Sequence, residues 1–129
     1  MKPLAIVVAL VSLAGCATTY NPAAETTTSV ATTTTIPQGD FATLLDAMRD
    51  RFAKLADEMS TNERGDARRT LEEIEALWSA MQEEATDRGR QFADDLRRIV
   101  DFAVTSVVRN RPADADKGLR FIDLFIAAL

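Results

Sequence analysis

Residues 40–59 read DFATLLDAMRDRFAKLADEM, and the spacing of their apolar side chains predicts the kind of fold that the chain adopts. Most of the steps between these side chains are three or four residues, and the side chains are Phe41, Leu44, Leu45, Met48, Phe52, Leu55 and Met59. Such steps place them on one stripe of an α-helix, with the charged residues outside it. Asp40 follows Pro37 and Gly39, so we expect its carboxylate to cap the start of this helix.

Two further helical segments follow this first one. A polar turn is expected at residues 60–65, with Asp66 as the cap of a second helix. The apolar stripe of the second helix consists of Leu71, Ile74, Leu77, Trp78, Met81 and Ala85. The third helix carries Phe92, Leu96, Ile99, Val100, Ala103, Val104 and Val107. A break is expected between them at residues 86–89, although the apolar phase nearly continues across it.

The third helix is expected to end at residues 110–112, since a proline disfavours helix in the residue before it. Asp114 would then cap a last helix. At an offset of 48 residues, Asn62 aligns with Asn110 and Asp66 with Asp114. Shared helix periodicity or an old duplication could produce this internal repeat. In either case the repeating unit is helix–turn–helix.

The fold class that these patterns predict is all-α. Residues 40–129 form one domain, a small antiparallel bundle of about four helices arranged as two helical hairpins, because short turns make neighbouring helices antiparallel. Residues 16–39 are rich in threonine and lack apolar periodicity, so we expect a disordered tether.

The N-terminus has the layout of a signal peptide. Lys2 is followed by an apolar run from Leu4 to Ala14, which is too short for a stable membrane span of ~20 residues. The run ends in Leu13-Ala14-Gly15-Cys16, which resembles the lipobox of bacterial lipoproteins. The resemblance implies cleavage of residues 1–15, acylation of the Cys16 thiol, and attachment to the outer face of a bacterial membrane, either the cell membrane or an outer membrane.

The composition argues against catalysis and nucleic-acid binding. The chain has no histidine and one cysteine, which removes Ser-His-Asp and Cys-His arrangements, so we expect a protein that is not an enzyme and holds no cofactor. The formal net charge of −5 gives no basic footprint for nucleic acid. Acidic pairs such as Glu83 and Asp87 could bind a hard cation, but we expect solvated faces with arginine partners: Glu84 with Arg88, and Asp94 with Arg97 or Arg98.

Three features have both a structural and a functional interpretation. Residues 64–66 spell Arg-Gly-Asp, a tripeptide that some adhesion receptors bind. We instead interpret Gly65 as a turn residue and Asp66 as a helix cap. Trp78 is expected in the core. The segment from Phe121 to Leu129 is apolar on several faces, so it is either the central helix of the bundle or in part a partner surface, and we expect burial.

Residues 65–129 also show a weak resemblance to the helical extracytoplasmic domains of bacterial iron permeases and their accessory proteins. The resemblance lies in Gly65-Asp66, Leu71, Ile74, Trp78 and Glu84, followed by an amphipathic helix and a short apolar one. The expected function is a non-enzymatic binding or scaffolding module of the cell envelope, with a possible envelope protein as partner. The alternative is an accessory protein of metal or solute uptake.

Overall fold

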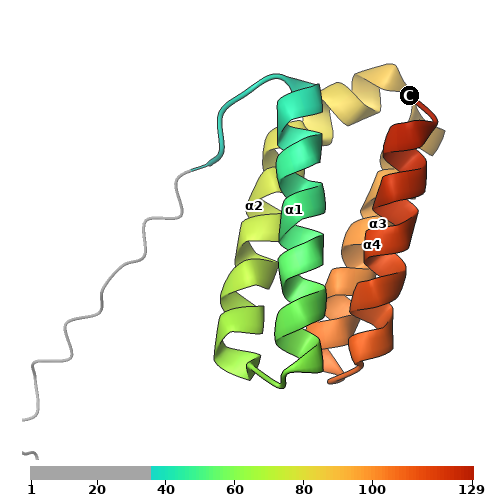
Figure 1. Ribbon diagram of the computed structural model, residues 1–129. Coiled ribbons are helices and arrows are strands. Elements are labelled where there is room, and N and C mark those ends of the chain that lie inside the picture. Colours follow the sequence, from blue (N-terminus) through green and yellow to red (C-terminus); the bar gives the residue numbers. More distant parts are fainter. Residues whose placement is uncertain (1–35) are drawn as a thin grey trace, which may run out of the picture. The chain divides into compact units, whose positions relative to one another are not determined.

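The computed structural model describes residues 36–129, and within this range the chain forms four α-helices and no strand. The helices are α1 (Phe41–Ser60), α2 (Arg64–Arg88), α3 (Arg90–Val108) and α4 (Pro112–Ala127). Each helix packs on its neighbour in the chain, and α1 also packs on α4, which closes a ring (Figure 1). The predicted all-α bundle of two hairpins is therefore confirmed. The predicted signal peptide, Cys16 and most of the predicted tether lie outside the described residues.

The start of α1 agrees with the prediction from the sequence. The Oδ1 atom of Asp40 accepts a hydrogen bond of 2.8 Å from the backbone N–H of Thr43, which has no partner inside the helix. This bond favours the ionised carboxylate and lowers the pKa of Asp40 from its ordinary value. Asp40 is therefore a helix cap.

The predicted caps of α2 and α4 are wrong. α2 begins at Arg64 and α4 at Pro112, so Asp66 and Asp114 each lie in a first helical turn. There the carboxylates face the positive end of the helix dipole, and they pair with Arg69 and Arg111. Pro112 can start α4 because its fixed φ suits a helix and its missing N–H would have had no helical partner. Gly65 also lies within α2 and forms no turn.

The two hairpins turn in the same way, which explains where the preceding helices end. Asn62 and Asn110 have φ values of 62° and 50°, the left-handed conformation that asparagine tolerates. One residue further on, the N–H of Glu63 donates to the Glu58 carbonyl, and the N–H of Arg111 donates to the Ser106 carbonyl, both at 2.8 Å. Each hairpin therefore closes with the same hydrogen-bonded stop after its first helix, at the offset of 48 residues found in the sequence.

The break expected at residues 86–89 lies at Gly89 alone, because α2 runs to Arg88 and α3 begins at Arg90. Gly89 has a φ of 133° and a ψ of 147°, a conformation that residues with a side chain rarely adopt. The guanidinium of Arg88 lies 4.3 Å from the centre of the Phe41 ring. The last turns of α2 and the first turn of α3 consequently cover the end of the bundle at which α1 begins (Figure 1).

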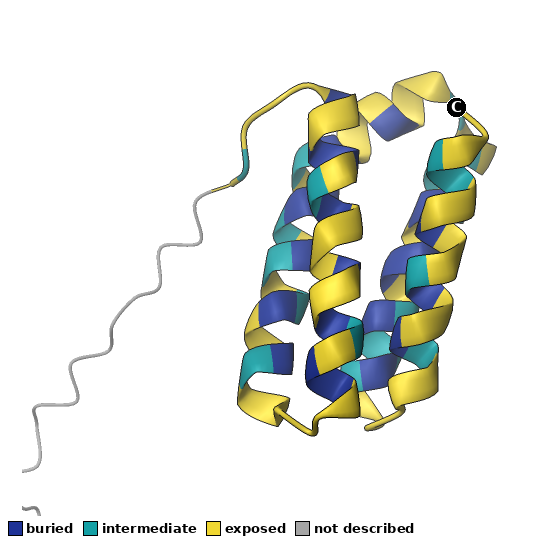
Figure 2. Cartoon of the chain, viewed as in Figure 1, coloured by how far each residue is buried: buried dark blue, intermediate teal, exposed yellow. Residues whose placement is uncertain are grey.

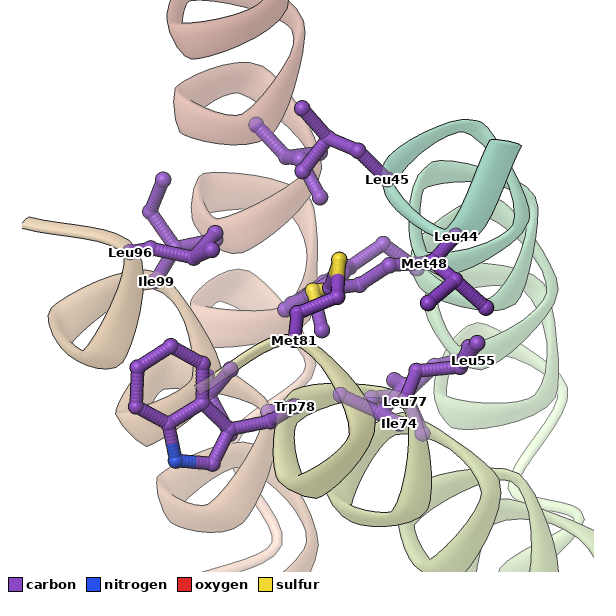
Figure 3. Packing of buried hydrophobic residues seen from close by; sticks show 14 of the residues in the cluster. Leu44, Leu45, Met48, Leu55, Ile74, Leu77, Trp78, Met81, Leu96 and Ile99 are labelled. Carbon is purple, nitrogen blue, oxygen red and sulfur yellow. The ribbon is translucent and has the colours of Figure 1, made fainter. Parts of the chain in front are cut away.

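The core lies between the four helices and follows the predicted stripes closely. Buried positions face inward along every helix, and exposed positions face outward (Figure 2). Met48 of α1 and Met81 of α2 point toward each other, with Leu96 and Ile99 of α3 across from them (Figure 3). The apolar side chains of the predicted α1 stripe are all buried, and Trp78 is only 7% exposed, as predicted.

The contact of α4 with the core depends on small residues. Gly118 and Ala115 are buried, and a Cβ atom built on Gly118 would lie 2.5 Å from Cε1 of Phe52. The Phe52 ring of α1 therefore lies directly on the backbone of α4. On the surface, the Nε atom of Arg49 donates to Asp123 at 2.6 Å, which raises the pKa of Arg49 and joins the same two helices.

Candidate functional site

The apolar C-terminal segment is not buried as a whole, contrary to our expectation. Ile122 is fully buried and Phe125 and Ile126 are partly buried, whereas Phe121 is 42% and Leu124 66% exposed. The reason is the position of α4 on one side of a ring of four helices, where only one stripe of the helix can face the core. The consecutive apolar residues of this segment point in different directions, so part of them faces the surface.

The exposed apolar side chains border a groove between α3 and α4, which we name the α3–α4 groove. Its volume is about 680 Å³, and its lining is mostly apolar. The lining residues are Asp95, Arg98, Ile99, Asp101, Phe102, Thr105, Phe121, Leu124 and Phe125. This volume falls within the range of about 300–1,000 Å³ typical of small-molecule sites. Within the part of the chain that the structure describes, this groove is the best candidate for a binding site.

Aromatic rings connect the two walls of the groove. Phe102 of α3 and Phe121 of α4 stack with centroids 5.5 Å apart and an interplanar angle of 8°. The ammonium of Lys117 lies 4.5 Å from the centre of the Phe102 ring, a cation–π arrangement. Phe125 packs on Phe92 with centroids 4.8 Å apart, so its ring joins the groove to the core.

Sequence reasoning missed Phe102, because it lies off the apolar stripe of the third helix. The signal was present as a phenylalanine between Asp101 and Ala103, on the flank of a helix whose stripe was already complete. A large aromatic residue beyond the stripe widens the apolar face of a helix, and on α3 this wider face forms one wall of the groove.

The charged groups at the rim of the groove have unequal partners. Asp95 accepts a hydrogen bond of 2.8 Å from the Gln91 side chain, and Asp101 accepts one of 3.1 Å from Arg97. The Arg98 guanidinium, by contrast, has its nearest carboxylate oxygen on Asp95 at 3.6 Å, which is too far for a hydrogen bond. Arg98 thus keeps most of its donors available to a guest in the groove.

Of the acidic residues singled out in the sequence, only Glu84 forms the ion pair predicted for it, and within residues 36–129 neither Glu83 nor Asp87 pairs with a basic side chain. Glu84 pairs with Arg88 at 2.7 Å as predicted. The predicted pairing of Asp94 is wrong, because Arg98 approaches Asp95 and Arg97 bonds Asp101 instead. Within residues 36–129, three or more potential metal-ligating side chains are nowhere grouped closely enough to hold a metal ion.

The Arg-Gly-Asp sequence and Trp78 have structural explanations. Asp66 pairs with Arg69 in the first turn of α2, so the tripeptide is part of a helix. Trp78 packs in the core and lines a hollow of about 360 Å³ together with Gln82 and Arg90.

Cys16, the predicted lipidation site, lies outside the described residues. Among the helices of residues 36–129, none combines the length and the apolar character needed to cross a bilayer. No protein-family model, curated protein or solved structure matches the chain.

Proposed function

We propose that the protein is a membrane-anchored extracytoplasmic lipoprotein whose helical bundle serves as a non-enzymatic binding or scaffolding module of the bacterial cell envelope. Support for the anchor comes from Leu13-Ala14-Gly15-Cys16 at the end of a short apolar run. Support for the binding role comes from the α3–α4 groove, and this observation carries the proposal. Two acyl chains would attach the protein firmly, whereas one gives only marginal membrane binding.

The groove supports binding because its apolar side chains remain in contact with water. Leu124 is 66% exposed although it lies beside the partly buried Phe125. Apolar surface that stays in water forgoes about 25 cal/mol for each Å² that a partner could cover. A concave apolar surface with a few polar groups at its rim is typical of binding sites.

The anchor is tested by Cys16→Ser in a bacterium that acylates lipoproteins. We expect this variant to lose metabolically incorporated fatty acid and to leave the tightly bound membrane fraction, because a hydroxyl replaces the thiol that carries the lipid. Thr18→Ser, two residues beyond the thiol, is the matched control and should stay acylated. Retention of fatty acid by Cys16→Ser would contradict the proposed anchor.

The binding role is tested by photo-crosslinking in intact cell envelopes. A photoreactive residue at position 124 samples the groove, and one at position 108 samples another exposed apolar site, since Val108 is 74% exposed and does not line the groove. We expect a discrete adduct from position 124 and none from position 108. Equal labelling from the two positions would argue against a binding surface at the groove.

A further inference from the structure

We propose that the α3–α4 groove binds a single-chain amphiphile with an anionic headgroup, such as a fatty acid. This inference rests on the binding role proposed above and adds the chemical class of the ligand. The volume of about 680 Å³ suits a small molecule, and the apolar lining residues include Ile99, Phe102, Phe121 and Phe125. These side chains offer apolar surface to an alkyl chain.

The dimensions of the groove favour a compact guest over a docked helix. On α3 the lining runs from Asp95 to Thr105, ten residue steps or roughly 15 Å at about 1.5 Å per residue. On α4 it runs only from Phe121 to Phe125, roughly 6 Å by the same rise. A docking helix needs anchor residues over two turns or more, and the wall on α4 offers only about one.

The charges at the groove favour an anionic headgroup. Asp95 and Asp101 already accept hydrogen bonds from Gln91 and Arg97. Arg98 lines the groove with its donors largely available, and Lys117 brings a second cation to the ring of Phe102. A carboxylate placed near Arg98 would form a hydrogen-bonded ion pair with the guanidinium. A neutral headgroup can accept hydrogen bonds from Arg98 but lacks the opposite charge, and a cationic headgroup is repelled by it.

The same cations disfavour a second copy of the chain as the occupant. A two-fold dimer through this groove would bury the Arg98 side chains of both copies within one interface. Burying these cations costs free energy that the aspartates of the groove offset only in part, because Asp95 lies 3.6 Å from Arg98 without a hydrogen bond and Asp101 already pairs with Arg97. Self-association through the groove is therefore an outcome that would overturn the proposal.

The test is a calorimetric titration of the full chain carrying Cys16→Ser. This variant lacks the thiol that would carry the lipid, so no detergent is needed to keep an acylated protein in solution. The titrants share one alkyl chain and differ in headgroup: dodecanoate, dodecyltrimethylammonium and dodecyl maltoside, each below its micelle concentration. We expect saturable one-to-one binding of dodecanoate and binding at least about ten-fold weaker for the other two, since one charged hydrogen bond corresponds to roughly a factor of ten.

Three further variants in the same background locate the site. Arg98→Gln should weaken dodecanoate about ten-fold and leave dodecyl maltoside unchanged, because it removes only the charge. Leu124→Ser should weaken the binding of every titrant. Because Leu124 is exposed, the variant should keep its fold, which circular dichroism checks. Val108→Ser, which alters an equally exposed apolar site outside the groove, should change nothing. The leader is present in every variant, so its own affinity for amphiphiles cancels in the comparison.

Any of three results would overturn the inference: no saturable binding, equal affinity for the three headgroups, or dodecanoate binding that survives both Arg98→Gln and Leu124→Ser. A concentration-dependent dimer that Leu124→Ser abolishes would assign the groove to a second copy. Failure here leaves the proposed function testable by itself, because the anchor assay and the crosslinking at position 124 do not depend on the ligand class.

Discussion

Helices α1 and α4 offer the core similar amounts of apolar side chain, yet they bury very different shares of it. Every residue of the α1 stripe is buried, from Phe41 at one end to Met59 at the other. Of the comparable side chains on α4 and its C-terminal extension, only Ile122 is fully buried. The phase of the apolar residues, rather than their number, decides how much a helix in this bundle buries.

The two helices also contact the core in different ways. Large side chains on α1, such as Met48 and Phe52, fill the space between the helices. On α4, Gly118 and Ala115 allow the backbone to approach Phe52 closely, so the neighbouring helix supplies the volume. As a consequence, α4 turns its large side chains Phe121 and Leu124 outward, where they form one wall of the groove.

The largest expected effect contrasts Phe52 with Leu124. Phe52→Ala should lower the free energy of unfolding by about 3–5 kcal/mol, because it empties a fully buried site. Leu124→Ala should change it by no more than about 0.5 kcal/mol, since the side chain is mainly in water. Urea denaturation of both variants measures the difference, and similar losses would mean that α4 is buried more deeply than the structure has it.

A pair of glycines tests the close approach of α4. Gly118→Ala should destabilise the protein by about 1–2 kcal/mol. The new Cβ would clash with the Phe52 ring, and the cost of this clash should exceed the gain of about 1 kcal/mol in helix propensity. Gly65→Ala is the control, since a Cβ there meets no atom within 4 Å and should be neutral or stabilising. If the denaturation midpoints of the two variants shift in the same direction from the wild type, the close contact is refuted.

Phe125 lies between the two extremes of this comparison. The fully central helix expected from the sequence would make Phe125→Ala cost about 3–5 kcal/mol. The partly buried ring, packed on Phe92, predicts a smaller loss of about 1–3 kcal/mol. A thermal melt with a matched Leu124→Ala sample places the residue on this scale, and a loss as large as that of Phe52→Ala would restore the central position.

The smallest expected effect concerns the cap of α1, which α4 lacks. The hydrogen bonds from backbone N–H groups lower the pKa of Asp40 in the folded state. The cap therefore stabilises the fold fully above the pKa of about 4 that an aspartate has in the unfolded chain, and this stabilisation is lost as the pH falls through the lower pKa of the folded state. Asp40→Ala should lower the melting temperature by roughly 3–6 °C at neutral pH. Asp40→Asn should melt like the wild type at neutral pH and gain on it in acid, because an amide caps without titrating.

The amino-acid sequence by itself determined the four helices, the Asp40 cap and the stripe of α1. These are local properties, in which the spacing of apolar residues and the capping chemistry act within a few turns. The caps at Asp66 and Asp114 were predicted wrongly for a local reason too, since an aspartate in a first turn and one at a cap look alike in a sequence. Cys16 likewise remains a prediction from the sequence alone.

Only the tertiary structure decided which apolar side chains of α4 stay in water. The ring of four helices gives α4 one inward stripe, and the contact of Gly118 with Phe52 fixes which stripe that is. The α3–α4 groove follows from this rotation, because Phe102 and Phe121 come from different helices and stack only after the second hairpin has closed. Helix periodicity specifies a face of each helix, whereas a groove depends on how two such faces meet across the bundle.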